Sequence, residues 1–169
     1  MLLAVTTARG FVREFDTVNG AQIPIEWTKN RTVLVHLSLP AGGPLQDGSA
    51  SLNASAEDAL NIWNQHLVHM RFAVDRNSIL PASGTDGNTS VTMSNTVYGD
   101  TFGNGVLAVT LITPRSGTLL EADVIFNSTY DYDSYRGALQ PDVEDFHRIA
   151  LHEFGHVLGL DHPDEASPK

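Results

Sequence analysis

Residues 152–162, close to the end of this 169-residue chain, read His-Glu-Phe-Gly-His-Val-Leu-Gly-Leu-Asp-His. Four residues turn an α-helix by about 400°, so His152 and His156 share one helix face and can direct two imidazoles at one point. Glu153 lies about 100° further round and can border that point. Gly159 can end the helix, because glycine accepts the left-handed backbone conformation that reverses a chain. We expect the reversal to bring His162 round as a third nitrogen ligand.

Three neutral imidazoles with one open position are what a catalytic zinc ion requires, with a water in the fourth place. Such an ion lowers the pKa of its water and polarises a substrate carbonyl, while a neighbouring carboxylate takes the proton. Glu153 is the candidate base. The chain has no cysteine, so a zinc site must use histidine and carboxylate ligands. The competing interpretation is a helix whose surface histidines match this spacing by coincidence.

Composition indicates one soluble domain spanning residues 1–169. This length suffices to bury about 70% of the unfolded surface in a single core. The net charge of −10 argues against a nucleic-acid partner, because no basic face could neutralise phosphates. No apolar run approaches the roughly 20 residues that span a bilayer, so we expect no membrane partner. Residues 1–5 are too short for a signal peptide; we nevertheless expect a secreted monomer whose export signal is not part of this sequence.

Four strands and two helices are expected from the pattern of apolar residues. The strands are residues 31–40, 91–97, 106–113 and 121–127, which are rich in β-branched and aliphatic side chains. An apolar stripe at helical spacing predicts a helix that begins after an N-cap at Ser55 and extends to Met70. Asp142 is the predicted N-cap of the second helix, which carries the histidines.

The other histidines are not expected to bind metal. His147 lies about 140° from His152 on a helical wheel, and His36 stands alone in a strand. His66 and His69 are three residues apart but have no third histidine or carboxylate base beside them. Two acidic loops are possible calcium sites: residues 98–105, with Asp100 and Asn104, and the loop with Asp131 and Asp133. A solvated surface is the alternative for both loops.

Residues 152–162 resemble the metzincin zinc peptidases, whose signature is H-E-x-x-H-x-x-G-x-x-H. Residues 158–162, Leu-Gly-Leu-Asp-His, look most like the matrixin branch, the matrix-metalloprotease type. Residues 59–63 with Phe72 are similar to the first matrixin helix. Residues 105–109 are similar to the edge strand along which matrixins pair substrate, and residues 121–127 to the next strand.

The resemblance implies an α+β fold, with a twisted, mostly parallel five-stranded sheet, an antiparallel edge strand and two long helices. It also implies a zinc-dependent endopeptidase acting on protein or peptide substrates. Zinc would be held by His152, His156 and His162, and Glu153 would be the general base. The implied substrate-binding residues are Val106, Leu107, Ala108 and Val109.

Two departures from the family pattern lead to further expectations. Pro163, after the third histidine, is similar to the serralysins rather than to matrixins. The methionines are Met1, Met70 and Met93, so the methionine turn that metzincins place downstream of the third histidine is not found. We therefore expect a sequence truncated before that turn, with its C-terminal subdomain largely missing.

Two alternatives to an active peptidase stay open. One is a zinc-binding module without catalysis. The other is a latent zymogen in which residues 1–30, a possible extension or pro-segment remnant, cover the cleft. Without cysteine such a latch needs a carboxylate ligand, and Glu14, Asp16 and Glu26 are the candidates.

Overall fold

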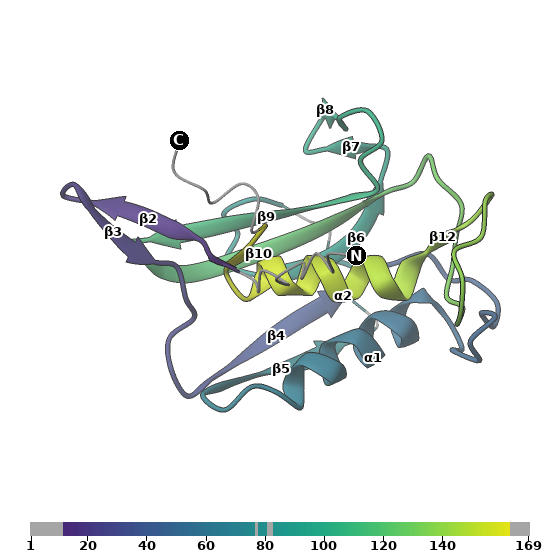
Figure 1. Cartoon of the computed structure of the whole chain (residues 1–169), viewed down its shortest axis with the longest axis horizontal. Helices are drawn as coiled ribbons and strands as arrows, with labels where there is room; N and C mark the ends of the chain where they lie inside the picture. Colours follow the sequence, from purple (N-terminus) through teal and green to yellow (C-terminus); the bar gives the residue numbers. More distant parts are fainter. Residues whose placement is uncertain (1–11, 77, 81–82, 163–169) are drawn as a thin grey trace, which may run out of the picture.

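A computed structural model describes residues 12–76, 78–80 and 83–162 of the chain, and its centre is a five-stranded sheet (Figure 1). The strand order is β5-β4-β6-β10-β9. The strands span β4 Arg31–Leu37, β5 Met70–Asp75, β6 Thr89–Ser94, β9 Ala108–Arg115 and β10 Thr118–Asn127. Neighbours pair in parallel except β9, which is antiparallel to β10 and forms one edge. This confirms the expected α+β fold with its antiparallel edge strand.

Two helices, α1 (Leu52–Asn64) and α2 (Phe146–Val157), run side by side across the sheet (Figure 1). β4 shows why one sheet face is covered: Val33, Val35 and Leu37 are buried, whereas Leu34 on the opposite face is 47% exposed. This alternation follows from the period of two residues in a strand. The core between helices and sheet is aliphatic and aromatic, and it includes Phe126, Phe146, Phe154 and Leu60.

Short strand pairs surround this frame. β1 (Val12–Arg13) pairs antiparallel with β13 (Leu160–Asp161), directly after the α2 helix. β2 (Phe15–Val18) and β3 (Ala21–Pro24) form a hairpin that projects beyond the sheet (Figure 1). The other pairs are β7 (Thr96–Val97) with β8 (Asp100–Thr101), and β11 (Tyr132–Asp133) with β12 (Glu144–Asp145). No helix in the described part of the chain has the length and apolar character needed to cross a membrane.

The predicted helix starts were wrong. Ser51, not Ser55, caps α1 and accepts a hydrogen bond from the Ala54 backbone N–H. Ser55 instead lies buried, with its hydroxyl 2.6 Å from that of Ser134. The cap of α2 is Asp145, not Asp142.

The end of α1 was also predicted too far along the chain. The helix ends at Asn64, and Met70 begins strand β5, which the sequence pattern did not reveal. The Asn64 side chain fixes this change of structure: its Oδ1 accepts from the Phe72 N–H at 2.8 Å, and its Nδ2 donates to the Phe72 carbonyl at 3.1 Å.

Candidate metal centre and cleft

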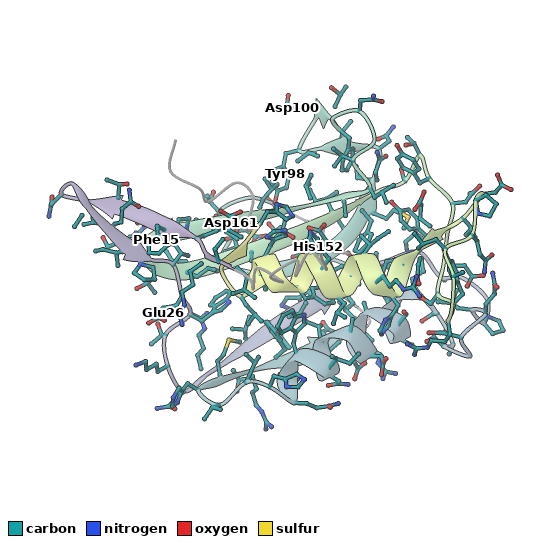
Figure 2. The ribbon with its side chains drawn as sticks, viewed as in Figure 1. Phe15, Glu26, Tyr98, Asp100, His152 and Asp161 are labelled. Atoms are coloured by element: carbon teal, nitrogen blue, oxygen red, sulfur yellow. The ribbon has the colours of Figure 1, made fainter. Side chains whose placement is uncertain are left out.

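The three signature histidines come together beside α2, with one ligand atom of each within 4.8 Å of the others. Figure 2 shows His152 on this helix. His152 and His156 project from the last two turns of the helix, which has Leu158 as its C-cap. Gly159 follows with a φ of +79°, the left-handed conformation expected of it, and the reversed chain delivers His162. The Nε2 atom of His152 lies 3.0 Å from the Nε2 atom of His162 and 3.2 Å from that of His156. The predicted ligands are therefore brought together.

This donor set fits a tetrahedral zinc ion. Zinc–nitrogen bonds of about 2.0–2.1 Å at tetrahedral angles separate the nitrogens by about 3.3 Å, close to the distances observed. The Nδ1 of His156 lies 2.7 Å from the Leu160 carbonyl and donates to it, so its Nε2 keeps a lone pair for a metal. Burial lowers the pKa of His152, which favours the neutral imidazole that binds metal.

Glu153 lies next to the histidines and is almost buried, with 7% of its surface exposed. The hydroxyl of Thr110, on edge strand β9, donates to its Oε2 at 2.6 Å. This contact fixes the carboxylate between the helix and the sheet edge. Thr110 was not among the predicted site residues; the available signal was a polar residue within the apolar run of residues 106–112.

A hollow of about 560 Å³ joins the histidines to the edge of the sheet. It is lined by the three histidines, Glu153, residues 106–110, Glu14, Asp161, Arg148 and Ile149. The four predicted substrate-binding residues thus line the same hollow as the histidines, although β9 begins only at Ala108, so Val106 and Leu107 precede the strand. The Leu107 carbonyl accepts from the Asn127 N–H at 2.8 Å, which holds this approach segment against β10.

Glu14 enters the same hollow from the N-terminal segment. Its N–H donates to the Gly159 carbonyl at 2.9 Å, and its carbonyl accepts from the Ile25 N–H at 2.9 Å. Burial, and then the negative charge of Asp161, raise the pKa of Glu14. Its carboxylate is not in the group of close ligand atoms that the histidines form.

The other two candidates for a latch lie elsewhere. Asp16 accepts a hydrogen bond from the Gly117 N–H, and Glu26 pairs with Arg13 at 3.0 Å. Of the three acids, Glu14 alone lines the hollow.

The histidines excluded from the site do have other surroundings. The Nε2 of His147 lies 2.9 Å from an Asp58 carboxylate oxygen, and the Nδ1 of His36 lies 3.3 Å from Asp75. His66 and His69 are exposed beyond the end of α1.

Neither predicted calcium loop contributes to a group of three or more close histidine or carboxylate ligand atoms in the described residues. Within residues 12–76, 78–80 and 83–162, the only group of three or more close metal-binding side chains is the histidine cluster. The Asp133 carboxylate is occupied by the backbone and side-chain N–H groups of Gln46, at 3.0 and 2.9 Å. Pro163 lies outside the described residues.

The fold and the histidine cluster agree with a comparison against known families. The chain matches the matrixin family, peptidase M10, over residues 26–168. This match covers most of the chain, and the protein therefore belongs to the matrixins, a family of zinc-dependent metallopeptidases. No individual curated protein matches it. Residues 12–25, which include Glu14, precede the matched region.

Proposed function

We propose that this chain is a zinc-dependent endopeptidase with Glu153 as its general base. The observation that supports this most strongly is the convergence of three imidazole Nε2 atoms beside a nearly buried carboxylate, in a hollow bordered by an edge strand. His152, His156 and His162 would hold the zinc. When bound, the ion supplies Lewis acidity and a water of lowered pKa.

The chain's own residues supply the proton transfers. In this proposal Glu153 takes a proton from a water beside the histidines and returns it to the leaving amine. The Thr110 hydroxyl keeps the carboxylate oriented for both transfers. A fixed carboxylate loses less freedom on reaching the transition state, which favours the reaction.

The substrate backbone is expected to extend the sheet. In the described structure β9 pairs with β10 on one side only, so its other edge presents backbone N–H and C=O groups to the hollow. A peptide lying antiparallel along residues 106–109 would use these groups as an added strand. Its amino-terminal half would then lie toward Arg115, and its carboxyl-terminal half toward Val106.

The test is hydrolysis of internally quenched peptides by the zinc-loaded chain and by Glu153→Ala. We expect the variant to keep its zinc and to lose at least about 100-fold in kcat/KM, the usual contribution of a positioned general base. Glu26→Gln removes one carboxylate outside the hollow and serves as the control. Equal cleavage by Glu153→Ala and wild type would refute the mechanism. A chain that binds zinc but cleaves no peptide would support the alternative of a non-catalytic zinc-binding module.

A further inference from the structure

Glu14 is held in the cleft by its backbone. Its N–H and C=O are bonded to Gly159 and to Ile25, both at 2.9 Å. The preceding residues Val12 and Arg13 pair with Asp161 and Leu160 in the β1–β13 ladder. The side chain therefore leaves the backbone at a fixed point beside the third histidine, without needing a contact of its own to keep it there.

The Glu14 carboxylate lies among groups of both charges: burial and then Asp161 raise its pKa, whereas His156 and His162 lower it. Within the described residues the carboxylate makes no side-chain hydrogen bond or ion pair, and its acidic neighbour Asp161 lines the same hollow. The basic residue lining this hollow, Arg148, lies 3.1 Å from the Asp145 carboxylate and also donates to the Gly137 carbonyl. The guanidinium of Arg148 is thus bonded elsewhere, and Glu14 and Asp161 are the two carboxylates beside the third histidine in this hollow.

The position of Glu14 along the cleft follows from its anchors. Gly159 lies just beyond the C-terminal end of α2. Two residues after Glu14, Asp16 accepts from the N–H of Gly117, which lies two residues beyond the end of β9. The segment therefore runs from the histidines toward the Arg115 end of the edge strand. Figure 2 shows Asp161 and Phe15 on the same side of His152, toward the β2–β3 hairpin.

We propose that Glu14 makes this cleft selective for peptides that carry Lys or Arg within the first three residues on the amino-terminal side of the cleaved bond. The inference rests on the proposed endopeptidase function and on the antiparallel substrate. A partly desolvated carboxylate beside a second negative charge gains most from a ligand that brings a cation and hydrogen-bond donors. The segment that carries Glu14 precedes the region matched by the matrixin family, so this selectivity belongs to the chain's own extension.

The experiment uses the zinc-loaded chain and sets of quenched peptides that differ at one position, with Lys, Ala or Glu at each of the three residues before the bond. We expect Lys to be preferred over Ala by about two- to fivefold in kcat/KM at one of these positions, the upper range of a solvent-exposed ion pair. Glu14→Gln should reduce this ratio to about one, and Glu14→Lys should favour Glu instead. Glu26→Gln, which removes a negative charge of the same segment outside the hollow, should keep the wild-type ratio. The preference should also weaken at high salt.

A wild-type enzyme without a Lys preference, or a Glu14→Gln variant that keeps it, would overturn the inference. So would a Glu14→Gln variant that cleaves every peptide faster by one common factor, because Glu14 would then block the site rather than select substrates. To separate this failure from failure of the proposed function, the labelled peptides are also titrated onto Glu153→Ala by fluorescence anisotropy. Tighter binding of the Lys peptide, lost in Glu14→Gln/Glu153→Ala, supports the inference even if no peptide is cleaved; equal binding contradicts it.

Discussion

Replacement of Gly159 by alanine should damage the fold and the metal centre together. Gly159 adopts a φ of +79° at the reversal that delivers His162. A Cβ added there would lie 2.4 Å from the Ile25 carbonyl oxygen, which is backbone and cannot rotate away. The carbonyl of Gly159 is also the acceptor for the Glu14 N–H, so a shift here would move the N-terminal segment as well.

Two costs contribute to the expected loss of stability. A left-handed backbone costs a residue with a Cβ about 1–2 kcal/mol. Forcing an extra methyl group against packed backbone costs about 1–3 kcal/mol. The sum is about 2–5 kcal/mol, which for a domain of this size lowers Tm by about 4–20 °C.

The assay is thermal unfolding of the zinc-free protein, followed by zinc titration. Gly20→Ala is a matched control, because Gly20 has a φ of +81° in the β2–β3 turn but nothing within 4 Å of its added Cβ. Gly20→Ala should show the backbone cost alone, and Gly159→Ala should lose more stability and bind zinc more weakly. Equal Tm values for the two variants, with unchanged zinc affinity, would refute the account of this turn.

Three further changes test other contacts. Thr110→Val keeps the side-chain shape but removes the hydrogen bond to Glu153, so kcat/KM should fall about tenfold at unchanged zinc content; an unaltered rate would show that the hydroxyl does not orient the base. Trp27→Phe removes the indole N–H that donates to the Val157 carbonyl at 2.7 Å, and should lower the free energy of unfolding in urea by about 1–2 kcal/mol. An unchanged urea midpoint would contradict this. Burial raises the pKa of Asp123 to about 6, whereas its pKa in the unfolded chain is about 3.9. Between about pH 4 and 6 the folded protein therefore keeps a proton on Asp123 that the unfolded chain loses. This proton contributes to the free energy of unfolding in full below pH 4, and the contribution falls by up to about 3 kcal/mol as the pH rises to 6. Urea unfolding of wild type and Asp123→Asn at several pH values should show this fall only in wild type, and parallel curves would contradict it.

The histidine cluster was predictable because its geometry is local. The helical period places His152 and His156 together, and the conformational freedom of Gly159 allows the turn to His162. A strand in this region was predictable for a similar reason, since residues 106–113 are mostly aliphatic and β-branched, although β9 spans Ala108–Arg115. In both cases a short stretch of sequence contains nearly all of the information.

The remaining features depend on contacts between distant parts of the chain. Ser55 was predicted as the cap from local spacing alone, but it is buried against Ser134, 79 residues away, and Ser51 caps the helix. Strand β5 was missed because Met70 continues the apolar stripe of α1, and only the bonds from Asn64 to Phe72 show where the helix gives way. The contact of Thr110 with Glu153 spans 43 residues and has no local pattern.

The most direct test of the central claim is the coordination of zinc in the loaded protein, measured by X-ray absorption together with metal content. We expect one zinc per chain with three imidazole nitrogens and one further light-atom ligand, and loss of one imidazole in His162→Ala. A zinc bound by fewer than three imidazoles in the wild type, or coordination unchanged in His162→Ala, would contradict it.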